Sequence, residues 1–273
     1  MKSPAQIILE KALLPKHLDS AGFRAKVAAD VRRRSFFTAR CAEEDFLAPC
    51  RGACAEVAEG RIGQGDFVRK MRETLDALGY DPERGGWVDK PDNDGEPVRG
   101  LKDLTSETRL RLIARTQSQM AASVGRLNAE TEDTRWAHPA WLLRRFVGKK
   151  ASRDWQERWL AAAESVDWEG VEPSGDLFIA LKSSPIWQAI GDGAGGYEDT
   201  LGNPFPPFAY NSGMDFERVS RETCATLDLP DDNGEIMEAR LEPNEDDWAW
   251  AAEKFGDDFV SATRAALEDM DET

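Results

Sequence analysis

The segment from Gly191 to Met214 constrains the fold of this chain more than any other part of its sequence. It holds five glycines before Pro204, and three prolines lie between residues 204 and 207. Proline has no amide hydrogen and a fixed φ, and it pushes the preceding residue toward an extended backbone. Neither a helix nor a central strand can run through such a segment. We therefore expect an ordered, extended loop that is anchored by its aromatic side chains, Phe205, Phe208 and Tyr210.

The rest of the sequence predicts a mainly α-helical protein with a small β element, an α+β class. We divide the chain into an N-terminal helical region (1–80), a loop or hinge (81–100), a helical core with the long loop (101–230) and an acidic C-terminal segment (231–273). The hinge is expected at 81–100 because three prolines and four glycines fall within that segment.

In the N-terminal region, residues 4–57 have a helical pattern, and Pro49 is expected to end or kink it. One helical face is predicted to hold Phe23, Val27, Val31, Arg34 and Thr38. A second helix is expected over 65–78, with Asp66 as its cap and Gly79 as its stop.

The clearest helix of the chain begins after Thr105 or Ser106. It repeats Leu110, Ile113, Gln117, Met120, Val124 and Leu127 at helical spacing. Its remaining surface is expected to hold Arg109, Arg111, Arg115 and Arg126. Further helices are expected at 139–146 and 153–166, a strand at 177–181 and a turn or helix at 185–190. The apolar side of the 153–166 helix is expected to hold Trp155, Trp159, Leu160 and Ala163.

The acidic C-terminal segment predicts one final helix from Trp248 onward, with a narrow apolar stripe. The stripe holds Trp248, Ala252, Phe255, Phe259, Ala262, Ala266 and Met270. It has to be buried against this protein or against a partner, and we slightly favour packing within the protein.

Charge is distributed unevenly along the chain, whose formal net charge is -16. Residues 1–40 hold nine basic and three acidic residues, whereas residues 231–273 hold three basic and fifteen acidic residues. This asymmetry suggests two different neighbours, although a solvated surface at both ends is the favoured explanation. The candidates for partner binding are Arg32, Arg33, Arg34, Trp248, Phe255 and Phe259.

The four cysteines do not form the pattern of a small secreted disulfide scaffold. The N-terminus has no apolar run of the kind that a signal peptide needs. No stretch approaches the roughly 18 apolar residues of a membrane span. We therefore expect synthesis in a reducing cytoplasm and no membrane partner.

No motif for catalysis or for a cofactor stands out, and we expect none. The two histidines, His17 and His138, lack a nucleophile motif such as Gly-x-Ser-x-Gly. Cys50 and Cys54 lack a second pair at zinc-site spacing, so packing as small hydrophobes is favoured. The glycines at 191, 193 and 196 match the letters of a dinucleotide fingerprint, but no helix opens after them.

Nucleic-acid binding has a local signal between Arg99 and Arg158. This stretch holds thirteen basic and seven acidic residues, interleaved with four tryptophans. Such a pattern is typical of a phosphate-binding surface with stacking groups, but a tryptophan-rich core with arginines outside is the favoured alternative. The candidates for DNA contact are Arg144, Arg145, Lys149 and Lys150.

An ordered series of blocks resembles one known family. The blocks are GRIGQGDF (60–67), LGYDP (78–82), LKDLTS (101–106), RLRLIARTQ (109–117), RDWQERW (153–159), ALKSSPIW (180–187) and LGNPFPPFAYNSGM (201–214). In this order they resemble the phage Mu F-like minor head, or head-morphogenesis, proteins of phages and prophages. The resemblance covers residues 60–229. Many relatives end this region in a Cys-x-Cys or His-containing stretch, which residues 210–214 replace here.

The resemblance implies a non-enzymatic, multimeric component of the virion head. Such a protein contacts the portal or the major capsid protein, and in some cases DNA during packaging or exit. Two alternatives remain open at this point. One is a metal-dependent nuclease that uses acids near Arg153, Asp154 and Trp155. The other is an assembly or scaffold factor that leaves the particle and docks through its acidic tail.

Overall fold

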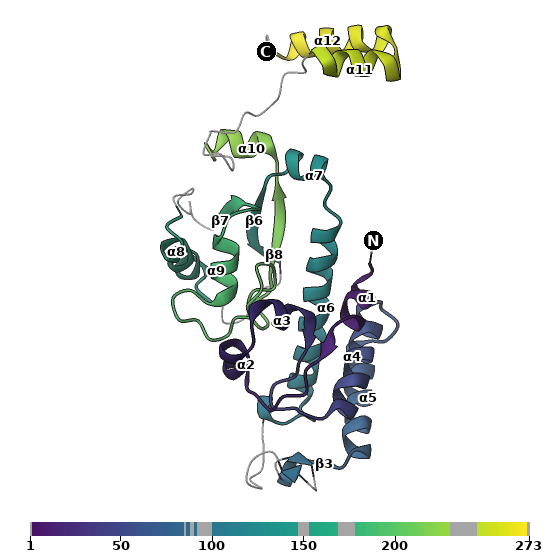
Figure 1. Ribbon diagram of the computed structural model, residues 1–273, viewed down its shortest axis with the longest axis vertical. Helices are drawn as coiled ribbons and strands as arrows, with labels where there is room; N and C mark the ends of the chain where they lie inside the picture. The colour runs from purple at the N-terminus through teal and green to yellow at the C-terminus, as the bar shows by residue number, and fades with distance from the viewer. Residues whose placement is uncertain are drawn as a thin grey trace.

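The computed structural model describes residues 2–84, 86–87, 90–91, 100–146, 153–168, 178–229 and 245–271. Within this part the chain is mainly helical with small sheets of two or three strands, which confirms the expected α+β class. Figure 1 shows a helical unit at the N-terminal side, a sheet with its helices beside it, and the long helix α6 (Glu107–Asn128) running between the two.

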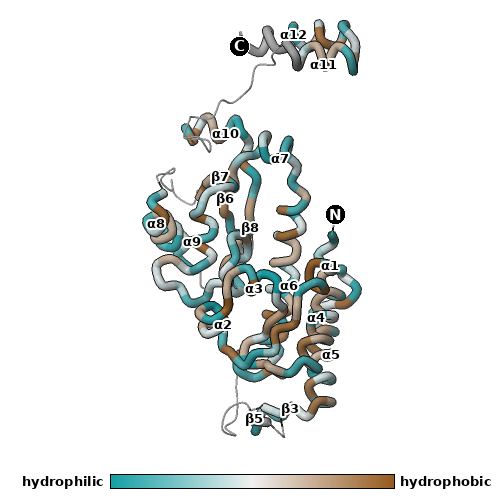
Figure 2. Tube along the Cα trace, viewed as in Figure 1, coloured by the Kyte–Doolittle hydropathy of each residue, from teal (hydrophilic) through white to brown (hydrophobic). Residues whose placement is uncertain are grey.

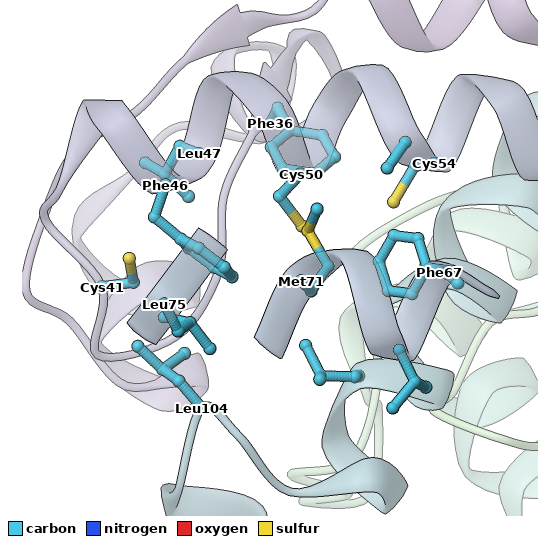
Figure 3. Close-up of a cluster of buried hydrophobic side chains, with 14 of the residues drawn as sticks. Phe36, Cys41, Phe46, Leu47, Cys50, Cys54, Phe67, Met71, Leu75 and Leu104 are labelled. Carbon is cyan, nitrogen blue, oxygen red and sulfur yellow. The ribbon is translucent and has the colours of Figure 1, made fainter. Parts of the chain in front are cut away.

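The helical unit consists of α1, α4, α5 and most of α6 packed on one another. The bounds are Pro4–Leu9 for α1, Glu44–Ala58 for α4 and Gln64–Ala77 for α5. Figure 3 shows its centre, where Phe46, Cys50 and Cys54 of α4 face Phe67, Met71 and Leu75 of α5. Both cysteines are buried free thiols, so the prediction that they pack as small hydrophobes is confirmed.

The predicted single helical face over residues 23–38 is wrong. Two short helices, α2 (Ser20–Lys26) and α3 (Ala29–Arg34), are separated at Val27, whose φ of -115° and ψ of 123° are extended. The chain then enters β2 (Ser35–Phe36), which pairs in parallel with β1 (Ala12–Leu13). This pairing joins residues far apart in sequence, so helical periodicity could not reveal it. Pro49 does not end its helix either, because α4 continues to Ala58.

The helix predicted over 65–78 is confirmed as α5. Its N-cap is Gly63, and Asp66 makes no cap but pairs with Arg69 one turn later at 2.9 Å. The helix that we expected after Ser106 is confirmed as α6.

The Pro/Gly-rich segment after α5 contains only very short elements. They are β3 (Tyr80–Asp81), the 3-10 turn η1 (Pro82–Arg84), β4 (Gly86–Trp87), β5 (Lys90–Pro91) and η2 (Gly100–Lys102). The N-terminal core runs from Ala5 to Ala121 and so contains residues from both sides of this segment. Hydrophobic packing therefore crosses segment 81–100. The domain boundary that we expected there stays a prediction.

The second unit is a three-stranded antiparallel sheet in the order β7-β6-β8. The strands are β6 (Ala140–Arg145), β7 (Phe178–Leu181) and β8 (Met214–Val219). The helix predicted over 139–146 is therefore wrong, because β6 pairs on both sides, with Ala140 opposite Leu181 and Val219. The strand predicted near 177–181 is confirmed as β7. Short helices α7 (Glu132–Ala137) and α10 (Arg221–Thr226) flank the sheet.

Aromatic side chains fill the space between this sheet and helices α8 (Trp155–Ser165) and α9 (Ile186–Asp192). Trp187 lies at the centre, with its ring 5.5 Å from that of Trp159 and 6.0 Å from that of Trp141. The helix predicted over 153–166 is confirmed as α8, but its buried side differs from the prediction. Leu160 is 44% exposed, whereas Arg158 and Ala162 are buried.

The C-terminal segment forms two helices, so the single final helix that we expected is wrong. These are α11 (Glu245–Phe255) and α12 (Asp257–Asp271), which pack on each other as a hairpin. The break falls at Gly256, whose φ of 88° is a conformation that glycine adopts without strain. Figure 1 shows the hairpin apart from the rest of the molecule, beyond α10. Of the predicted stripe, the side chains of Ala266 and Met270 lie outside the described residues.

Candidate interaction site

The loop between α9 and β8 contacts several parts of the molecule, and arginines from several elements form hydrogen bonds with it. Arg24 of α2 donates to the carbonyl oxygen of Thr200 at 2.8 Å, and Arg153 donates to that of Tyr210 at 2.6 Å. Arg115 of α6 donates to Oδ1 of Asn211 at 2.9 Å. As expected, no helix or strand of the described residues interrupts the loop between Asp192 and Met214, and Phe205 and Phe208 anchor it in the interior.

Asp199 ties the loop to α8 through two ion pairs. Its carboxylate oxygens lie 2.5 Å from Nε of Arg153 and 2.8 Å from Nη2 of Arg158. The Arg158 guanidinium lies 4.1 Å from the ring centre of Tyr197, and its side chain is only 9% exposed. A guanidinium that is desolvated between a carboxylate and an aromatic face is held in one position.

Gly191 lets the loop cross α9 at very short range. A Cβ atom at this position would stand 1.9 Å from the carbonyl oxygen of Asn203. The amide of Gly202 donates to the carbonyl oxygen of Gly191 at 2.8 Å, which fixes the crossing. The glycines that match a dinucleotide fingerprint thus serve packing, and α9 ends at Asp192 with no helix opening after Gly196.

The three N-terminal arginines proposed for partner binding differ in their surroundings. Arg32 is mostly enclosed and donates to the carbonyl oxygens of Arg24 at 2.6 Å and Val27 at 3.2 Å. Arg33 contacts Asp30 and donates to Gln188 at 3.4 Å. Arg34 is exposed. Arg32 therefore supports the loop from within, and Arg34 is the one of the three that faces solvent.

A groove of about 690 Å³ lies where the loop meets α1 and α6. Its lining includes Ser123, Gly125, Pro206 and Pro207, and the ion pair between Arg126 and Asp215 (2.5 Å) lies at its side. The neighbouring edge strand β8 uses its own amides locally. The amide of Met214 donates to Ser212 at 3.2 Å, and that of Phe216 donates to Asp215 at 2.8 Å. Such local bonds protect an edge against pairing with another strand.

A smaller hollow of about 130 Å³ continues from this groove, and a buried carboxylate lies in its wall. Glu130 is nearly enclosed and accepts from Nζ of Lys182 at 2.5 Å, with Nε of Arg218 at 3.7 Å. The negative charge of Glu130 is thus compensated by these two neighbouring cations. The two hollows offer shape and hydrogen-bonding groups, and the ionic groups around them are paired with each other.

The residues proposed for DNA contact are only partly described. Arg144 pairs with Glu217 across the sheet at 2.8 Å, and Arg145 donates to the carbonyl oxygen of Arg153 at 3.3 Å. Lys149 and Lys150 lie outside the described residues. The interleaved tryptophans are mostly interior, because Trp141, Trp155 and Trp159 are buried. Only Trp136 of these four is exposed, beside Arg221 at 4.8 Å, so the pattern reflects the core, as the favoured alternative expected.

The candidate residues of the acidic tail lie on its helical hairpin. The Phe255 and Phe259 rings are 5.1 Å apart, and both side chains are largely exposed. Arg264 of α12 lies over the Trp248 ring of α11 at 4.8 Å, so part of the predicted stripe is covered by the hairpin itself.

The side chains that we considered for catalysis or metal binding contribute to the fold in this structure. Asp154 caps α8 by accepting from the amide of Glu157 at 3.0 Å. A side-chain hydrogen bond with Cys54, together with burial, raises the pKa of the Cys50 thiol. His138 is the C-cap residue of α7. Among the described residues, no group of three His, Cys, Asp or Glu side chains is placed to hold a metal ion.

Two buried cations were missed by sequence reasoning. Burial lowers the pKa of Lys11 to about 8, an effect that Cys54 partly offsets. Burial likewise lowers the pKa of Arg109, which we had expected on the surface of α6. Its guanidinium donates to the carbonyl oxygens of Lys102 (2.6 Å) and Ala39. The wide buried face of α6 is the one signal that could have indicated the position of Arg109, because it lies next to Leu110.

No family model, curated protein or solved structure matches the chain in the comparisons with known proteins. Among the described residues, no helix has the length and apolar character needed to cross a bilayer.

Proposed function

We propose that this protein is a minor structural component of a tailed-phage or prophage head, where it contacts the portal or the inner shell and, through Arg144 and its basic neighbours, packaged DNA. The observation that supports this proposal is that the sequence blocks of the resemblance contact one another in the structure. Their polar groups form hydrogen bonds and ion pairs with each other and with the loop between α9 and β8, and their aromatic rings pack together. The blocks therefore stabilise one fold.

The C-terminal blocks show this most directly. Arg153 bonds to Tyr210 and Asp199, and Asp154 caps α8. Nε1 of Trp187 donates to the carbonyl oxygen of Leu181 at 2.7 Å, and its ring stacks 6.2 Å from that of Phe208. The blocks 153–159, 180–187 and 201–214 therefore form one packed unit around the loop.

The earlier blocks are linked in the same way. The Tyr80 hydroxyl accepts from the amide of Leu104 at 3.1 Å, which ties block 78–82 to block 101–106. Arg109 bonds to Lys102, which ties block 109–117 to the same turn. Gln117 accepts from Lys11 at 2.8 Å in the core of the helical unit. Residues far apart in sequence thus depend on one another, which is a physical reason for such blocks to occur together and in order.

The proposal assigns no catalytic residue. The nuclease alternative relied on acids near Arg153. Of the two acids in block 153–159, Asp154 and Glu157, Asp154 is used as the cap of α8. Digestion of linear, nicked and single-stranded DNA with Mg²⁺ or Mn²⁺ tests the alternative directly. We expect no cleavage by the folded protein, and cleavage that Asp154→Asn abolishes would contradict the proposal.

Mass spectrometry of purified particles from the source phage or induced prophage tests the proposal itself. We expect the protein in mature heads at a few copies per particle. Its presence in procapsids alone would favour the assembly-factor alternative. Absence from both mature heads and procapsids, with the protein detected in the lysate, would contradict a role in the head.

A further inference from the structure

The α11–α12 hairpin presents two aromatic rings within an acidic surface. Phe255 is 59% exposed and Phe259 is 49% exposed, on either side of the turn at Gly256. Glu253, Asp257 and Asp258 are exposed around them. Large apolar side chains rimmed by charge are typical of a docking surface. The rim predicts a partner surface that is basic and has an apolar floor.

A groove with that character lies between α2 and α3 of the same chain. Its volume is about 580 Å³, within the roughly 300–1,000 Å³ of ordinary binding pockets. Exposed Ala21, Ala25 and Ala28 are part of its lining, and we call them its alanine floor. Its charged lining residues are Arg24, Lys26, Arg32 and Asp192, so the groove has a net positive charge.

Two cations of this groove, Arg24 and Arg32, are held in place before any partner arrives. Arg24 is fixed by Thr200, and Arg32 is fixed by two backbone carbonyl oxygens and by Asp192 at 3.4 Å. Lys26 is exposed at the end of α2. A surface with fixed charges loses little side-chain entropy on binding, which favours association.

We propose that the hairpin of one copy docks into the α2–α3 groove of a second copy, with Phe255 and Phe259 on the alanine floor. The acids around the rings then face Lys26 and Arg24. Figure 1 shows the hairpin beyond α10 at one end of the body, and α2 and α3 nearer the middle of the body. This arrangement favours a neighbouring molecule over the same one as the acceptor. Repetition of such a head-to-tail contact builds a ring or a filament.

Sedimentation of the full-length protein over a range of concentration and salt tests this proposal. We expect self-association that weakens as salt rises, since exposed charges are screened. Phe255→Ser/Phe259→Ser should weaken it by about tenfold or more, as the loss of a central aromatic contact does. Lys26→Glu/Ala28→Glu should have a similar effect. A wild-type protein that stays monomeric throughout would overturn the proposal.

Matched controls exist on other surfaces. Phe146→Ser removes an aromatic side chain of similar exposure from the end of β6. Arg69→Glu/Ala77→Glu repeats the charge change of the groove variant on exposed positions of α5. Both controls should associate as the wild type does. Equal weakening by controls and test variants would overturn the assignment of these two surfaces.

Mixing the two test variants shows whether the interface joins a hairpin to a groove or two hairpins to each other. The hairpin variant keeps a functional groove and the groove variant keeps a functional hairpin, so the mixture has one intact contact and should form 1:1 dimers only. A hairpin-to-hairpin interface would leave the groove variant fully associated, which would overturn the proposal. So would a groove variant that associates normally but loses binding to duplex DNA, because the groove would then be a phosphate site.

Discussion

Lys11 is a buried cation in the helical core, and the described residues give its ammonium group an amide partner, Gln117 at 2.8 Å, and no carboxylate. Burial lowers its pKa to about 8, whereas an unfolded lysine titrates near 10.4. The unfolded chain therefore binds more protons between these two values. The free energy of unfolding should rise as pH increases from about 8 to 10.4, and the penalty is present in full below pH 8.

Replacing this side chain by a neutral one of similar length should stabilise the protein. We expect Lys11→Met to raise the free energy of unfolding at pH 7 by about 1–3 kcal/mol, as removal of a buried charge can do. The rise with pH should also become smaller. Urea denaturation at pH 7, 8, 9 and 10 measures both effects. Lys70→Met, on an exposed site of α5, is the control. If the free energy of unfolding changed with pH in the same way in Lys70→Met and Lys11→Met, this explanation would be contradicted.

Gly191 is the position where one added carbon atom has the largest consequence. Gly191→Ala would place a methyl group 1.9 Å from the backbone oxygen of Asn203. Since no side-chain rotation can relieve this overlap, we expect a loss of about 3 kcal/mol or more. Gly52→Ala, inside α4 with open space around it, should instead gain about 0.5–1 kcal/mol. Thermal unfolding of both variants checks the contrast, and equal effects would contradict it.

At the scale of elements, sequence periodicity predicted the helices α5, α6 and α8 and the absence of regular structure after α9. Each depends on signals within one short segment, such as Gly79 after α5 or Asp154 before α8. Strand β6 could not be predicted in this way. Its residues Ala140, Leu142 and Leu143 are good helix formers, and they are extended because β7 and β8 pair with them from about 40 and 75 residues away.

The candidate surfaces were predictable to a smaller degree. Charge counting indicated the basic N-terminal region and the acidic tail, and Phe255 and Phe259 are indeed exposed. It could not separate Arg34, which faces solvent, from Arg32, which supports the loop. That difference arises from the bend at Val27 and from the loop that reaches α2 and α3 from residues 192–202. It is a tertiary property.

The ion pairs of Asp199 make one element depend on another. Asp199→Asn would leave Arg158 mostly buried without a charged partner, so we expect a loss of about 1–3 kcal/mol. Amide exchange should rise locally, at Tyr210 and Leu201, whose amides are bonded within the loop. Asp66→Asn, which breaks an exposed pair on α5, is the control and should cost about 0.5 kcal/mol or less. Unchanged amide exchange in the loop of Asp199→Asn would contradict the idea that the ion pairs of Asp199 stabilise the loop.

At the scale of the whole molecule, α6 unites the two packed units. Leu110 and Ala121 lie in the N-terminal core, and Leu127 packs against the aromatic core of the sheet. The arginines that hold the loop come from both units, since Arg24 and Arg115 lie in the N-terminal half and Arg153 precedes α8. Figure 2 shows hydrophobic stretches along α4 and α5 and again at the sheet. The body should therefore unfold as one cooperative unit, although it has separate hydrophobic clusters.

The hairpin should contribute little to that unfolding. The buried hydrophobic clusters of the described residues contain no residue beyond Leu229, so a chain that ends there retains all of them. We expect removal of residues 230–273 to change the unfolding free energy of the body by less than about 0.5 kcal/mol, as a surface change does. Loss of fifteen acids and three basic residues also reduces electrostatic self-repulsion. Urea denaturation followed by far-UV circular dichroism, at concentrations where the full-length chain is monomeric, measures the difference. A loss of roughly 2 kcal/mol or more would show that the hairpin packs against its own body, because only burial of its aromatic side chains supplies that much free energy.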